Sequence, residues 1–160
     1  SLSLPHLASL GPPAYLFPMP MIWDAPLTTA VARDLDSRLA GKRLRAHVFD
    51  WERRELALFF RTLTLRWSLH PDAGWLRLSP PTEPPPTSRP LAAEVLKVEA
   101  QPDERLLRIR LRKVRGRVRT VQIILELMTN QWNALLLEGG ERRIRHVLWS
   151  RSSGSINSRR

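Results

Sequence analysis

The chain has 160 residues and 42% hydrophobic content, enough for one hydrophobic core but not for two independent domains. Lysine and arginine outnumber the acidic residues by 26 to 15, giving a net charge of +11, so nucleic acid is the first partner to consider. The absence of cysteine excludes disulfides and thiolate metal sites, and we expect a cytoplasmic protein.

The two ends of the chain differ from the middle in composition. Residues 1–22 are apolar but carry five prolines, and they lack the basic start and cleavage site of a signal peptide, so we expect an irregular arm. Residues 151–160, "RSSGSINSRR", predict the start of a linker to downstream domains. Uncharged apolar stretches are too short and too interrupted by proline to span a bilayer, so no membrane partner is expected.

A capped amphipathic helix is predicted directly after the arm. Asp24 can cap the first turn, and Pro26 suits the first positions of a helix. Apolar residues then recur every four positions, at Leu27, Val31, Leu35 and Leu39. We expect this stripe to cover a sheet.

After the helix the apolar period switches to two, in short segments separated by turn residues, which predicts about eight strands in a meander. The segments are residues 44–49, 55–63, 65–70, 75–78, 95–100, 106–112, 118–128, 134–137 and 144–149. The predicted fold class is therefore α+β, mainly β, with residues 23–150 forming an antiparallel β-sandwich or flattened barrel that carries the N-terminal helix.

A proline cluster interrupts this pattern at residues 79–90, "SPPTEPPPTSRP". Each of its six prolines lacks a backbone donor, so the segment is not expected to join a central strand. We interpret it as an extended connector. Among the tryptophans, Trp67 shares a face with Leu65 and Leu69 and is predicted to be core, whereas Trp51 and Trp132 lie beside turns and could stack on bases.

Patterns typical of catalysis or cofactor binding are missing from the sequence. The four histidines are scattered, with no partner at metal-ligand spacing, and no glycine-rich phosphate loop occurs. The carboxylate pairs Asp34/Asp36 and Asp103/Glu104 have no predicted pocket that would raise a pKa. We therefore expect neither a metal, nor a cofactor, nor an enzymatic activity.

Arginine alternates with aliphatic residues in the predicted strand 106–112, so the arginines should share one face and the aliphatic side chains the other. These arginines are Arg108, Arg110 and Arg112, and three more follow around the next turn, Arg115, Arg117 and Arg119. Such a row must be solvated, paired with acids across the ladder, or neutralised by an anionic partner. Glu126 is the only acid on the returning strand, and it lies far from the turn.

The order of these pieces resembles the N-terminal domain of the NFACT family over residues 21–150. The pieces are the helix, the strand pair at 53–79, the proline loop, the strand after "DER", and "ILELMTNQWNALLLE". The family includes the bacterial ribosome-associated quality-control factor also known as a fibronectin-binding protein. The resemblance implies a fold similar to the N-terminal domain of formamidopyrimidine-DNA glycosylases, and a coiled coil and a second RNA-binding domain further along the same chain.

The resemblance also implies function. Members of the family bind large ribosomal subunits that carry stalled peptidyl-tRNA, and they recruit tRNA for tailing of the nascent chain. The family's Glu-hydrophobic-Met tripeptide falls on Glu126–Met128, and its following asparagine on Asn133. Its Asp-Arg pair, associated with tRNA recruitment, falls on Arg105 with either Asp103 or Glu104. Charge and resemblance together give the candidate RNA-binding residues Asp103, Glu104, Arg105, Arg108, Arg110, Arg112, Arg115, Arg117, Arg119 and Asn133.

Two other functions are compatible with the sequence. A DNA glycosylase-like enzyme would share the fold, but the sequence has no N-terminal Pro-Glu with which such an enzyme could act. A basic adhesion or scaffold domain would fit the fibronectin-binding name of the family.

Overall fold

The computed structural model describes residues 24–50, 52–69, 75–101, 103, 105–117, 119–128, 131–139 and 143–147. These residues form the helix α2 (Ala25–Leu39) and nine strands. The strands are β1 (Arg43–Asp50), β2 (Glu55–Phe60), β3 (Thr64–Ser68), β4 (Trp75–Ser79), β5 (Arg89–Gln101), β6 (Leu106–Lys113), β7 (Thr120–Met128), β8 (Gln131–Glu138) and β9 (Arg143–Val147). The expected arm at 1–22 and the expected linker at 151–160 lie outside the described residues.

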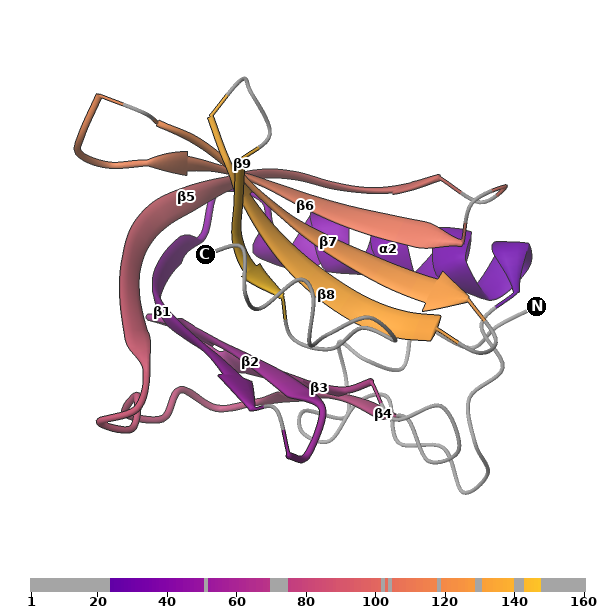
Figure 1. Cartoon of the computed structure of the whole chain (residues 1–160), viewed down its shortest axis with the longest axis horizontal. Coiled ribbons are helices and arrows are strands. Elements are labelled where there is room, and N and C mark those ends of the chain that lie inside the picture. The colour runs from indigo at the N-terminus through magenta and orange to yellow at the C-terminus, as the bar shows by residue number, and fades with distance from the viewer. Residues whose placement is uncertain are drawn as a thin grey trace.

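All nine strands belong to one antiparallel sheet, in the order β4-β3-β2-β1-β5-β6-β7-β8-β9. Two meanders, β1 to β4 and β5 to β9, meet where β1 pairs with β5. Figure 1 shows that the sheet bends at β5, so that the two meanders face each other. The predicted α+β, mainly β class is confirmed, and the two layers of the sandwich are halves of one continuous sheet.

The pairing of β5 contains an irregularity. The register with β6 shifts between Val95 and Lys97, which leaves Leu96 as an extra residue with 47% of its surface exposed. Such a bulge bends the strand that carries it and increases its twist. The bulge therefore helps β5 to pair with β1 in one half of the sheet and with β6 in the other.

The beginning of β5 corrects the prediction for the proline segment. Residues 79–90 were expected to stay outside any central strand, but β5 already begins at Arg89 and includes Pro90. Pro90 pairs with Ala46 of β1, whereas the pairing of β5 with β6 begins only at Ala93. At Pro90 the strand thus has a neighbour on one side only, a condition in which a missing N–H is tolerated.

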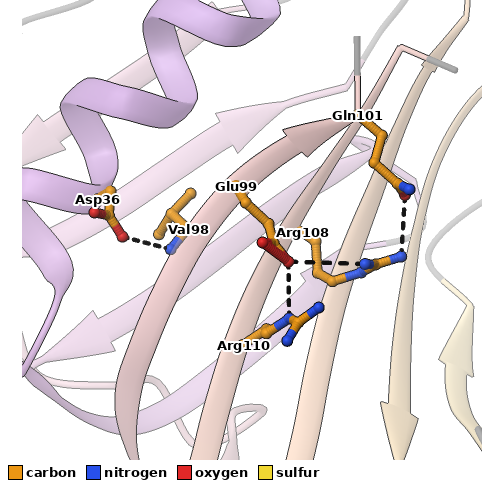
Figure 2. Close-up of polar contacts among 6 residues, drawn as sticks. All are labelled: Asp36, Val98, Glu99, Gln101, Arg108 and Arg110. Atoms are coloured by element: carbon orange, nitrogen blue, oxygen red, sulfur yellow. Dashed lines mark hydrogen bonds and ion pairs between the residues drawn. The ribbon is translucent and has the colours of Figure 1, made fainter. Parts of the chain in front are cut away.

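The helix forms as its sequence predicts. The Asp24 carboxylate accepts a hydrogen bond from the Leu27 amide at 2.8 Å, which caps the first turn. The predicted apolar stripe, Leu27, Val31, Leu35 and Leu39, is buried in the main core. The Asp36 carboxylate accepts a hydrogen bond from the Val98 amide at 2.8 Å, so α2 is attached to β5 beside the bulge (Figure 2).

The core lies on the inner side of the bent sheet. Side chains from both meanders and from α2 form one continuous cluster, in which Trp67 is fully buried as predicted. The opposite side of the β5–β6 region carries charged residues, among them Arg110 and Arg112. Within the described residues, α2 lacks the length and hydrophobicity of a membrane-spanning helix.

Candidate nucleic-acid interface

The alternation predicted for β6 is present. Leu107, Ile109 and Leu111 are fully buried in the core. Arg108, Arg110 and Arg112 point to the other side of the sheet, and we refer to these three residues as the arginine ladder.

The arginine ladder is paired with acids of β5, and Figure 2 shows the contacts of Arg108 and Arg110. The Arg110 Nε lies 2.8 Å from the Glu99 Oε2, and the Arg108 Nη1 lies 3.8 Å from the same oxygen. Arg108 also donates a hydrogen bond to the Gln101 side chain at 3.1 Å. Further along the strand, the Arg112 Nη2 lies 2.9 Å from the Glu94 Oε1.

These acids were missed from the sequence because only the returning strand, β7, was considered as a source of partners. β5 is the other neighbour of β6, and its register places Glu99 opposite Arg108 and Glu94 opposite Arg112. The signal was present in the sequence, since Glu94 and Glu99 precede the turn into β6. A row of arginines on one strand can be stabilised by solvent, by acids on a neighbouring strand or by an anionic partner. Acids on the neighbouring strand β5 account for Arg108, Arg110 and Arg112.

Pairing does not remove the arginine ladder from solvent. The Arg110 and Arg112 side chains are 49% and 58% exposed, whereas that of Arg108 is 16% exposed. Ion pairs at such exposed positions are worth about 0–1 kcal/mol, so they can be exchanged for contacts with another anion. Arg108 is the member of the ladder that is least available to a partner.

The second group of arginines lies beyond the ladder, in the loop between β6 and β7. Arg115, Arg117 and Arg119 are exposed there, and we refer to them as the basic hairpin. Gly116 supplies the left-handed backbone (φ +103°) that this loop requires, and its carbonyl accepts a hydrogen bond from the Arg119 Nε at 3.3 Å. None of the three forms an ion pair with a carboxylate of the described residues.

Arg105 lies at the opposite end of β6, in the turn from β5. Its φ of +48° is in the left-handed region, which is uncommon for a residue with a side chain. Its carbonyl accepts a hydrogen bond from the Leu127 amide at 2.8 Å, which ties the turn to β7. Asp103 is exposed in the same turn, and Glu104 lies outside the described residues.

The residues of the Glu-hydrophobic-Met motif lie beside this turn. Glu126 and Asn133 are directly opposite each other on β7 and β8, and the Asn133 amide donates to the Glu126 carboxylate at 3.4 Å. The Asn133 Oδ1 also accepts a hydrogen bond from the Ala134 amide at 2.9 Å. Leu106 pairs with Glu126, so Arg105, which directly precedes Leu106, lies at the same end of the sheet.

The predicted site residues therefore fall into three groups along β6. Arg105, Asp103 and Asn133 lie at one end, the arginine ladder lies along the strand, and the basic hairpin lies at the other end. The side chains of Trp51 and Trp132 are outside the described part of the structure. Among the described residues, no group of three histidine or acidic side chains is placed to hold a metal ion.

Comparison with solved structures identifies the fold. The N-terminal domain of fibronectin-binding protein PavA from Streptococcus pneumoniae matches 82% of the chain, with a TM-score of 0.63 and 23% identity. The N-terminal part of the fibronectin/fibrinogen-binding protein from Streptococcus suis matches 80%, with a TM-score of 0.60 and 19% identity. The chain shares the fold of these N-terminal domains.

The likeness is limited to part of those structures. The matched region covers 57% of the pneumococcal chain and 54% of the Streptococcus suis chain, so this chain spans just over half of their length. No protein-family model matches the sequence, and no curated protein does either. The comparison therefore establishes the fold of the chain.

Proposed function

We propose that this chain is an RNA-binding domain of the NFACT type, which acts in the cytoplasm in ribosome quality control. In this role it binds the large ribosomal subunit and recruits tRNA for tailing of the stalled nascent chain, without catalysing a reaction itself. The observation that carries the proposal is the basic hairpin, whose three exposed arginines make no ion pair with a described carboxylate. The phosphate backbone is the polyanion that such a group binds through charge.

The placement of Arg105 supports the tRNA part of the proposal. The left-handed backbone at Arg105 costs energy that an ordinary turn residue would avoid, and such strain concentrates at functional positions. The Leu127 amide donates a hydrogen bond to the Arg105 carbonyl, so the backbone that carries the Arg105 side chain is held in place. A guanidinium presented in this way can bind a phosphate with two parallel hydrogen bonds.

Substitution of the basic hairpin tests the proposal. Replacing Arg115, Arg117 and Arg119 with alanine should weaken tRNA binding and reduce the slope of log affinity against log salt. A reduction of about 2–3 is expected if each arginine contacts one phosphate. Fluorescence anisotropy with labelled tRNA, repeated over a range of salt concentrations, measures both quantities.

A matched control removes the same charge elsewhere. Arg33 in α2, Arg53 after β1 and Arg61 after β2 are exposed, and their triple alanine variant should retain most of the affinity and the slope. Equal losses in the two triple variants would show that only net charge matters. Binding that is independent of salt, or release of a base from damaged DNA, would contradict the proposal.

A substitution at Arg105 separates tRNA binding from ribosome binding. Arg105→Gly removes the guanidinium and keeps a residue suited to the left-handed turn, so the free energy of unfolding should change by less than about 1 kcal/mol. Affinity for tRNA should fall more than affinity for the large ribosomal subunit. Equal affinities of the variant and the unmodified protein for tRNA would exclude Arg105 from the interface.

A second candidate function is adhesion, because the two structural neighbours are named for fibronectin binding. The basic hairpin could equally bind an acidic protein surface. Immobilised fibronectin and tRNA can be offered to the same preparation. Saturable binding to fibronectin that tRNA does not compete for, together with no tRNA binding, would favour adhesion.

A further inference from the structure

A cavity of about 440 Å³ opens on the inner side of the bent sheet, at the end where β6 runs into the basic hairpin. Its lining comes from β1, β5, β6, β7 and β8, so it forms only when both halves of the sheet are in place. Its volume lies within the range of about 300–1,000 Å³ that is typical of small-molecule sites.

The floor of the cavity is apolar. Leu91, Val121 and Leu136 line it, and all three are buried in the main core. Aliphatic side chains offer no hydrogen-bond partner, so a hydroxyl-rich group placed against them would lose its hydration without compensation. A flat ring with little hydration on its faces is the better fit to this floor.

His47 and Arg89 line the cavity, and they are directly opposite each other on β1 and β5. His47 is 3% exposed, and its ring packs edge-on against Phe49 with the centroids 5.3 Å apart. Arg89 lines the cavity and is exposed, so it is accessible to a ligand from solvent.

Charged groups of β6 and β8 also line the cavity. The Lys113 Nζ lies 2.9 Å from the Glu138 Oε1, and Arg115 follows at the beginning of the basic hairpin. Three basic residues line the cavity, Arg89, Lys113 and Arg115, and Glu138 is the only acidic residue among the described residues that line it. The cavity therefore combines an apolar floor with an excess of positive charge at its walls.

We propose that this cavity binds a nucleoside monophosphate unit, either as a free nucleotide or as the phosphorylated terminal nucleotide of an RNA. The phosphate would lie between Arg89 and Arg115, and the base would lie against Leu91, Val121 and Leu136. Charge-assisted hydrogen bonds from guanidinium groups suit a phosphate, and the apolar floor suits the face of a base. The cavity is separate from the outer side of the sheet and shares only Arg115 with the proposed RNA interface.

Calorimetric titration with adenosine 5′-monophosphate tests this inference. The nucleotide should bind, and adenosine or inorganic phosphate alone should bind at least about tenfold more weakly, because each makes half of the contacts. Absence of heat and of any protection against thermal unfolding at millimolar nucleotide would overturn the inference. Equal affinities for adenosine and its monophosphate would also overturn it.

Variants locate the binding to the cavity. Arg89→Ala should weaken nucleotide binding by about tenfold or more, because it removes one charge-assisted contact. Glu138→Gln should strengthen binding, since it frees Lys113 from its carboxylate partner. Arg61→Ala removes an exposed arginine that does not line the cavity and should leave the affinity unchanged. Affinities that are the same in Arg89→Ala and Arg61→Ala would place the nucleotide elsewhere.

Competition distinguishes the two sources of the nucleotide. A short RNA with a 5′-phosphate should displace the monophosphate if the cavity receives an RNA end, whereas the same RNA without the phosphate should not. A cavity specific for free nucleotides would hold the monophosphate against both RNAs, and either result supports the site. Equal displacement by both RNAs would show that the terminal phosphate is not recognised and would overturn the inference. Loss of tRNA binding in a variant that keeps Arg115, such as Arg117→Ala with Arg119→Ala, would leave the calorimetric result unaffected, because neither residue lines the cavity.

Discussion

The arginine ladder and the basic hairpin each contain three arginines at alternate positions, yet their surroundings differ. Arg108, Arg110 and Arg112 pair with carboxylates or an amide of β5, whereas the hairpin arginines make no ion pair with a described carboxylate. The reason is topological, because the pairing of β5 with β6 ends at Ala93 and Lys113, just before the hairpin. The charge available to a partner therefore depends on which strand runs alongside, and not on arginine content alone.

The largest expected difference between the two regions is in the free energy of unfolding that is lost when an apolar side chain is truncated. Ile109 lies beneath the arginine ladder and is fully buried, so Ile109→Ala should lower the free energy of unfolding by about 2–5 kcal/mol. Val114, at the base of the basic hairpin, is 36% exposed, and Val114→Ala should cost less than about 1 kcal/mol. Urea unfolding monitored by tryptophan fluorescence measures both changes in the free energy of unfolding. Similar losses would mean that the hairpin is packed as firmly as the ladder.

Removing the acids of β5 should make the ladder behave like the hairpin. In the double variant Glu94→Gln and Glu99→Gln, the ladder arginines lose their ionic partners and should add to the attraction for tRNA. We expect affinity to rise by up to about tenfold at low salt, with a steeper salt dependence. Anisotropy titrations against the unmodified protein provide the measurement. An unchanged salt slope would show that RNA does not reach the ladder.

The smallest effect is expected for the individual ion pair. A double-mutant cycle on Arg110 and Glu99 should give a coupling free energy of about 0–1 kcal/mol, because the Arg110 side chain is half exposed and the pair is screened by solvent. Chemical denaturation of the two single variants and the double variant yields this quantity. A coupling above about 2 kcal/mol would mean that the ladder is a structural network rather than an exchangeable one.

Local patterns predicted the elements well, and non-local pairing was the source of the errors. The helix follows from the Asp24 cap and the four-residue repeat, both of which act within one or two turns. The two faces of β6 follow from alternation alone. The partners of its arginines do not, because Glu94 and Glu99 become neighbours only when β5 pairs with β6.

Neither the early start of β5 nor the cavity could be predicted from the sequence, and the reason is again non-local pairing. Pro90 is compatible with a strand only because β6 is absent beside it, which is a property of the sheet rather than of the proline. Likewise, His47, Arg89 and Glu138 lie on three different strands, and their sequence separation gives no sign that they line one cavity.

The junction of β1 and β5 has a consequence for how the chain folds. Within each meander every strand pairs with the strand next to it in sequence, so both can form through short loop closures. The β1–β5 pairing instead joins residues such as His47 and Arg89, which are far apart along the chain. Closing this long loop has a larger entropic cost and slows assembly. We therefore expect the two meanders to gain structure early, with zippering of β1 onto β5 as the slow step of folding.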